Sequence, residues 1–211
     1  MQGVEGVASR HSRVPRGLNN LPQAFLVMLV AMPALAQAAG DTSSLASSPS
    51  FTFSFDSVSP PGWSTGGGDP PYAWKHQSGG APTHSTGPTT GYGGSGRYYS
   101  AEARVPRSPG DVFELAYDGS ACAARGLAVA TVDFQYHMYG DGMGTLRVVD
   151  EQASTVWSLS GDQGNMWHAA SIAVYASSFR FEYVRGISWR GDAGIDEVTV
   201  SCGVAPPSLP P

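Results

Sequence analysis

Along most of the chain, hydrophobic and polar residues alternate with a period of two, which is the pattern of strands with one buried face. In the longest such run, hydrophobic residues share one predicted face at every second position from Ala128 to Met138. No stretch keeps the 3.6-residue period of a helix. The pattern therefore predicts these strands: Phe51–Phe55, Tyr98–Ala103, Val112–Tyr117, Leu127–Met138, Leu146–Val149, Thr155–Leu159, Trp167–Tyr175, Phe179–Val184 and Ile195–Val200.

Polar or Gly-rich turns separate these segments. Short strands at this density over about 150 residues predict an all-β domain, an antiparallel jelly-roll β-sandwich. In the last strand, the apolar spacing from Ile195 to Val198 is three rather than two, which predicts a bulge. Residues 57–97 are rich in Gly and Pro and punctuated by aromatic residues, so we expect a long loop packed on the domain surface.

The amino terminus has the pattern of a secretory signal peptide. A basic lead precedes the apolar run Ala24–Leu35, and Ala36-Gln37-Ala38 fits a small-x-small cleavage site. An uncleaved signal anchor is the alternative. The expected protein is therefore secreted or held on the extracellular face of a membrane, and the apolar run is short for a span of roughly 20 residues.

The expected organisation has four parts. A signal peptide at 1–38 and a loose Ser-rich linker at 39–50 precede the sandwich domain at 51–203, and a Pro-rich tail follows at 204–211. Nothing after residue 40 is apolar for long enough to span a membrane.

The charge of the chain bears on its possible partners, and its cysteine content bears on the compartment in which it folds. Charged residues make up 14% of the chain and the net charge is −5, without the basic stripe that a nucleic-acid partner requires. The two cysteines, Cys122 and Cys202, are compatible with a disulfide in a secreted protein, or with two unpaired thiols. A bridge would close a loop of about 80 residues and contribute roughly 4.5 kcal/mol in the chain-entropy model.

Several short motifs occur in a fixed order: Tyr136-His137-Met138-Tyr139-Gly140, Met143-Gly144-Thr145-Leu146, Ser160-Gly161-Asp162-Gln163-Gly164 and Arg190-Gly191-Asp192-Ala193-Gly194-Ile195-Asp196-Glu197-Val198. Together they resemble the MAM domain, an extracellular module of meprins, neuropilins and receptor tyrosine phosphatases. The resemblance covers residues 51–203. It implies a jelly-roll β-sandwich and a role in adhesion or oligomerisation.

The sequence departs from the family pattern in its cysteines and at one polar position. Pro61 and Thr131 stand where the family usually has Cys, and Cys122 is displaced by nine residues from its expected place. Cys202 alone lies where the family has one, so the resemblance leaves the pairing open. Position 90, where many members have Asp, is Thr90.

Asp56 and Asp196 are the candidate metal ligands. They lie at the ends of the first and last predicted strands, and carboxylate oxygens suit Ca²⁺. Resemblance to family members with a cation there supports a calcium site, whereas Thr90 weakens it. In the alternative interpretation, both carboxylates accept hydrogen bonds from backbone amides in turns. No other cofactor is expected.

Three tryptophans in Gly-rich segments, Trp63, Trp74 and Trp189, are the candidates for an exposed interaction patch. His137 is interpreted as a hydrogen-bonded structural residue. The tripeptide Arg190-Gly191-Asp192 has the integrin-binding sequence, and we interpret it as a turn with a structural Asp.

Catalysis has little support, because the chain has neither a His-Glu-x-x-His nor a Gly-x-Ser-x-Gly motif. The leading hypothesis is a non-catalytic recognition module whose partner is another extracellular or cell-surface protein, or a second copy of itself. A carbohydrate-binding jelly-roll module, with a glycan as partner, is the alternative. A glycan hydrolase is the third hypothesis and requires two carboxylates in one cleft.

Overall fold

The computed structural model describes residues 47–57, 60–67 and 70–204. The predicted signal peptide at 1–38 lies outside these residues, as do the linker up to residue 46 and the tail from residue 205. Within the described part, no helix has the length and apolar character needed to cross a bilayer.

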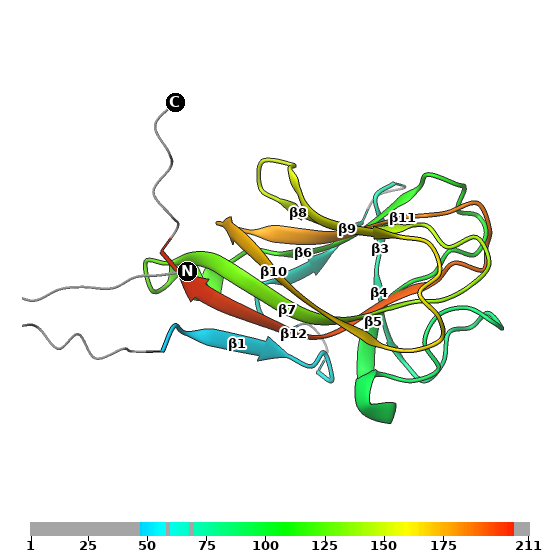
Figure 1. Ribbon diagram of the computed structural model, residues 1–211, viewed down its shortest axis with the longest axis horizontal. Coiled ribbons are helices and arrows are strands. Elements are labelled where there is room, and N and C mark those ends of the chain that lie inside the picture. Colours follow the sequence, from blue (N-terminus) through cyan, green and yellow to red (C-terminus); the bar gives the residue numbers. More distant parts are fainter. Residues whose placement is uncertain (1–46, 58–59, 68–69, 205–211) are drawn as a thin grey trace, which may run out of the picture. The chain divides into compact units, whose positions relative to one another are not determined.

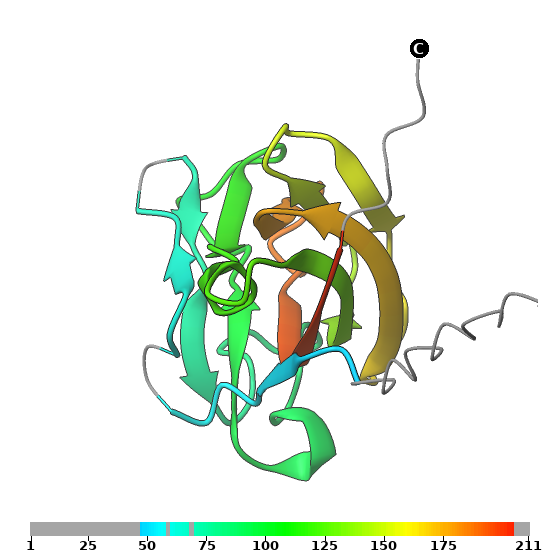
Figure 2. The same ribbon diagram turned by 90° about the vertical axis from the view of Figure 1, so that its left-hand side faces the viewer.

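The described residues form a sandwich of two six-stranded sheets (Figures 1 and 2). The first sheet has the order β10 (His168–Ala176), β7 (Ala128–Met138), β12 (Ala193–Gly203), β5 (Arg97–Ala101) and β4 (Lys75–Ser78), with β1 (Ser50–Phe53) also beside β12. The second has the order β2 (Trp63–Thr65), β6 (Val112–Tyr117), β11 (Phe179–Val184), β8 (Thr145–Asp150) and β9 (Thr155–Ser160), with β3 (Tyr72–Ala73) also beside β6. All pairs are antiparallel except β3 with β6. The predicted all-β sandwich is confirmed.

The core lies between the two sheets and is rich in aromatic rings. Alternation along β7 places Phe134 and Met138 in the interior, where the Phe134 ring meets that of Phe181 at 4.9 Å between centroids. Phe113, Leu115 and Tyr117 of β6 fill the opposite layer, as their period of two predicted.

Bulges modify this alternation at two places. The one predicted between Ile195 and Val198 is present, because the pairing of β12 with β7 shifts register between Asp196 and Thr199. A second irregularity changes the expected face of β7: Val129 is buried, whereas Ala128 and Ala130 are only partly so. Its cause is a pair of register shifts near that end of β7, where β10 carries an extra residue opposite β7 and β7 carries one opposite β12.

The segment 57–97 is more ordered than the loop expected from its composition. It contributes β2, β3 and β4 to the sheets and a turn of 3₁₀ helix at Tyr92–Gly94. Residues 118–126, which connect the predicted strands Val112–Tyr117 and Leu127–Met138, contain the short helix α1 (Ser120–Ala123), which is seen end-on in Figure 2. Elements of two to four residues are too short to show a period, so their sequence signal is absent.

Candidate functional site

Asp56 and Asp196 approach the same turn, residues 91–97, from two sides. The backbone N–H of Arg97 donates to Asp56 Oδ1 at 2.9 Å. The backbone N–H of Tyr92 donates to Asp196 Oδ2 at 2.8 Å, and that of Glu197 donates to Asp196 Oδ1, also at 2.8 Å. The two candidate ligands therefore hold both ends of one turn.

The turn fits closely around these carboxylates. Gly96 has φ +80°, and a Cβ at this position would collide with Asp56 Oδ1. Asp196 is 3% exposed, and its burial raises the pKa of its carboxyl group to about 7, with further contributions from the negative charges of Glu197 and Asp56.

This turn offers few free oxygen ligands for a calcium ion. Three of the four carboxylate oxygens of Asp56 and Asp196 already accept backbone amides. In the part of the chain that is described, no group of three or more His, Cys, Asp or Glu residues converges as a metal site. A Ca²⁺ ion with six or more oxygens would need backbone carbonyls and water for most of them. The hydrogen bonds match the alternative interpretation, and calcium stays a prediction.

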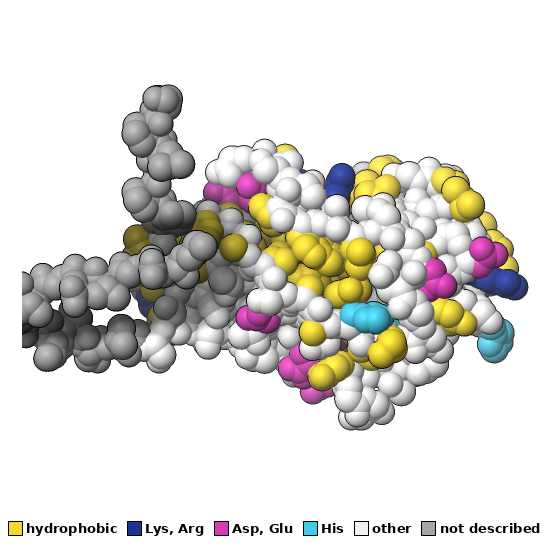
Figure 3. Space-filling model, viewed as in Figure 1, with side chains coloured by type: hydrophobic (Ala, Val, Ile, Leu, Met, Phe, Trp, Pro, Cys, Tyr) yellow, Lys and Arg dark blue, Asp and Glu magenta, His cyan; other side chains and the backbone are white. Residues whose placement is uncertain are grey.

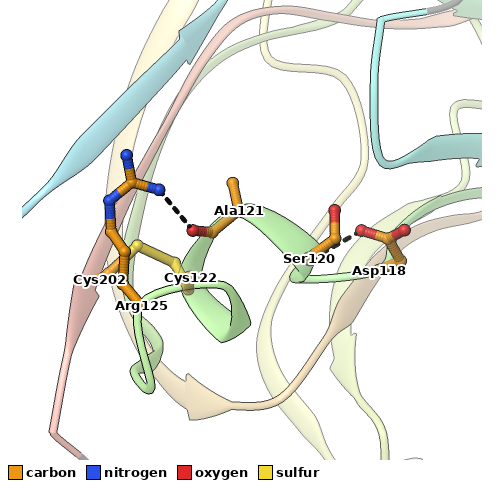
Figure 4. The surroundings of a disulfide bond; sticks show 6 residues. All are labelled: Asp118, Ser120, Ala121, Cys122, Arg125 and Cys202. Atoms are coloured by element: carbon orange, nitrogen blue, oxygen red, sulfur yellow. Dashed lines mark hydrogen bonds between the residues drawn. A yellow bond between two sulfur atoms is a disulfide. The ribbon is translucent and has the colours of Figure 1, made fainter.

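Cys122 and Cys202 are joined by a disulfide (Figure 4). Cys122 lies in α1 and Cys202 near the end of β12, with their Cα atoms 5.4 Å apart and both side chains buried. The short helix α1 places Cys122 within bonding distance of the last strand, although Cys122 is displaced in the sequence. The Arg125 side chain, which follows the helix, donates a hydrogen bond to the carbonyl of Ala121. The structure thus favours the bridge over two unpaired thiols.

The three candidate tryptophans do not share a surface. Trp74 is 2% exposed and lies in the core. Trp63 is half-buried, with its ring 5.2 Å from that of Phe55 and stacked on Phe181 at 6.2 Å. Only Trp189 is exposed, at 45%. The expected surface position is wrong for Trp63 and Trp74, because β2 and the residues around β3 fold into the sheets instead of forming a superficial loop.

The Arg-Gly-Asp tripeptide does not present its carboxylate. Asp192 is fully buried, and its Oδ1 accepts the backbone N–H of Ala103 at 2.7 Å. Its own backbone N–H donates to Thr86 Oγ1 at 2.8 Å. The residue is structural, as interpreted from the sequence, and it ties together three segments, which the sequence does not reveal.

His137 is also a structural residue. It is 1% exposed, its Nε2 is 3.2 Å from Asn165 Oδ1, and burial lowers the pKa of its imidazole to about 4. Its aromatic neighbours include Trp167 at 5.5 Å between ring centroids.

One pocket of about 260 Å³ over β6, β8 and β11 contains three carboxylates, the feature that a hydrolase would need. Each of them has a local partner. Glu114 lies 3.5 Å from the Arg180 guanidinium, Asp118 accepts the N–H of Ser120, and Asp150 accepts two backbone N–H groups of the following turn. These contacts are those of turn and sheet stabilisation.

Exposed hydrophobic side chains occur at the loop end of the sandwich where β7 and β11 end and β12 begins (Figure 3). Val105 is 71% exposed, Ile187 86% and Trp189 45%. Large hydrophobic residues at such exposure are typical of contact surfaces between proteins.

A disulfide-linked β-sandwich with exposed loops at one end defines the class of a β-sandwich module. The family model for the MAM domain, meprin/A5/mu, matches residues 53–203, and the chain belongs to this family.

Among its relatives, MAM domain-containing glycosylphosphatidylinositol anchor protein 1 is 39% identical over 135 residues in Gallus gallus and 35% identical over 136 residues in Homo sapiens. The matches cover 59% and 58% of this chain and 14% of each relative, so the chain spans only a small part of those proteins. Among solved structures, the K2 cleaved adhesin domain of Lys-gingipain superposes with a TM-score of 0.53 at 14% identity, covering 72% of this chain and 99% of that one. This likeness concerns the fold alone.

Proposed function

We propose that this MAM domain is a non-catalytic recognition and adhesion module that binds another extracellular or cell-surface protein, with a second copy of itself as one candidate partner. The observation that carries the proposal is the group of exposed hydrophobic residues Val105, Ile187 and Trp189 on loops at one end of a sandwich. A rigid sandwich that presents loops is a common arrangement for recognition.

Two further features support an extracellular setting. The buried disulfide is of the kind that persists in oxidising compartments. The relatives named above are called glycosylphosphatidylinositol anchor proteins, and such an anchor belongs to the outer surface of a membrane.

The carbohydrate-binding alternative has lost its main support. Exposed coplanar tryptophans on one sheet face would favour it, and Trp63 and Trp74 pack with the interior instead. A single exposed indole, that of Trp189, does not form such a platform.

Sedimentation equilibrium of residues 39–211, the mature chain expected from the sequence, tests the homophilic form of the proposal. We expect a concentration-dependent dimer that Trp189→Ala weakens and that Tyr175→Ala, which removes an equally exposed ring from β10, leaves unchanged. Runs with Ca²⁺ and with a chelator test the calcium prediction, since loss of the dimer on chelation would tie it to Asp56 and Asp196. A monomer at every concentration contradicts binding to a second copy.

A further inference from the structure

A pocket of about 470 Å³ lies beside Trp189. It is lined by three segments far apart in the sequence, namely residues 82–84, 104–105 and 189–190. Its exposed side chains are those of two arginines, one histidine, one proline, one valine and Trp189. The lining of the pocket therefore combines basic and apolar groups.

The two arginines have no acidic partner among the described residues. Arg147 and Arg180, in contrast, form ion pairs with Glu182, and Arg185 donates to backbone carbonyls. Arg104 is exposed and forms no ion pair with any residue that the structure describes, and the Arg190 guanidinium lies 4.7 Å from the centroid of the Trp189 ring. A guanidinium stacked on an indole keeps its N–H groups free at the edge, where they can receive a carboxylate.

Asp192 assembles the three segments of this pocket. Its Oδ1 binds the backbone N–H of Ala103, the residue before Arg104. Its backbone N–H binds Thr86 Oγ1, two residues after His84, and Asp192 itself follows Arg190 by two positions. The buried carboxylate thus brings both exposed guanidinium groups to one site.

The loop that carries Trp189 and Arg190 is packed too tightly to move freely. A Cβ at Gly140 would collide with the Arg190 carbonyl, and one at Gly142 would collide with the Ser188 side chain. The Tyr183 hydroxyl donates to the carbonyl of Gly191. A surface fixed in this way loses little conformational entropy on binding.

We propose that the pocket lined by residues 82–84, 104–105 and 189–190 binds a carboxylate side chain in an acidic segment of a partner protein. The carboxylate accepts hydrogen bonds from the Arg104 and Arg190 guanidinium groups, and the adjoining residue of the partner packs on Val105 and Trp189. Charge complementarity sets the acidic character, and the combination of Trp and Arg is typical of protein interfaces. This inference rests on the proposed function and adds the chemistry of the partner.

The test uses the ¹⁵N-labelled mature chain titrated with a capped hexaglutamate peptide, and with hexaglutamine as the uncharged control. We expect hexaglutamate to shift the indole N–H of Trp189 and the backbone N–H signals of residues 83–84 and 104–105. Arg104→Ala and Arg190→Ala should each weaken binding about tenfold, the usual effect of losing one charge-assisted hydrogen bond. Arg125→Ala is the matched control, because it removes the same charge from the disulfide end of the domain, before β7 begins.

Three results would overturn the inference: shifts that lie outside the pocket or never saturate, an equal loss in Arg125→Ala, or equal binding of hexaglutamine. A parallel titration with a heparin hexasaccharide separates the sources of negative charge, since tighter binding with the same shifts would assign the pocket to an acidic glycan. The inference and the proposed function can be told apart. If Trp189→Ala reduces recognition of a protein partner while hexaglutamate shifts no signal of the pocket, the proposed function stands and this inference fails.

Discussion

At the scale of single residues, Asp192 explains how an integrin-type tripeptide can serve a different purpose. Its carboxyl group is fully buried, and one of its oxygens, Oδ2, has no hydrogen-bond partner among the described residues. Burial raises the pKa of this group to about 6, and the charge of Glu102 adds to the effect. In this Arg-Gly-Asp motif, the arginine is therefore exposed at the surface, whereas the aspartate is buried and stabilises the fold.

This pKa predicts a pH-dependent effect of Asp192→Asn. The folded state binds the proton more tightly than the unfolded state, so the contribution of Asp192 to stability falls as pH rises from about 4 to about 6. Asparagine does not titrate. The free energy of unfolding of the variant, relative to that of the wild type, should therefore rise by at most about 3 kcal/mol between pH 4 and pH 7.

Urea unfolding of both chains at several pH values measures this difference. His137 has a lowered pKa and acts in the opposite direction, since its contribution is lost as pH falls below about 6.5, but it is common to both chains and cancels in the comparison. A difference that stays constant with pH would show that Asp192 titrates at its ordinary value.

At the scale of elements, the loops after β7 and β11 depend on glycine for their close approach. Gly142 has φ +85° and no space for a Cβ, because the Ser188 side chain fills it. Gly161, after β9, has almost the same φ, +83°, with open space around it.

The pair gives a matched test of loop packing. Gly161→Ala should lower the free energy of unfolding only by the cost of placing a non-glycine residue in the left-handed conformation, about 1–2 kcal/mol. Gly142→Ala adds a steric clash, so it should lower the free energy of unfolding by at least about 1 kcal/mol more than Gly161→Ala does. It should also weaken binding at the Trp189 pocket. Chemical denaturation of the two variants measures the difference, and equal losses would show that the 186–191 loop is free to move away.

The long strands were predictable because each shows a period of two over five or more residues, as β7 and β11 do. The bulge near Asp196 was predictable as well, since one extra residue changes the apolar spacing. The short strands β2 and β3 were not, because two or three residues carry no period, and their tryptophan neighbours were misplaced with them. At the candidate site, Asp56 and Asp196 stood out as strand-end carboxylates, whereas the role of Asp192 depends on contacts with Thr86 and Ala103 that no local pattern encodes.

At the scale of the whole domain, the disulfide lies at one end of the sandwich and the candidate binding surface lies at the other. The Cys122–Cys202 bridge fastens α1 to the last strand at the end where β7 begins. The loops that follow β7 and β11 carry the exposed hydrophobic residues and the basic pocket beside Trp189. This arrangement fits the proposed function, in which the loop end of the sandwich contacts the partner.

Binding of a fluorescent tetramer of the mature chain to intact animal cells tests protein recognition most directly. The account predicts saturable binding that is lost when the cells are treated with protease, survives glycosidase treatment, and is weakened at least tenfold by Trp189→Ala but not by Tyr175→Ala. Binding that glycosidase abolishes, or that Trp189→Ala leaves unchanged, would contradict the account.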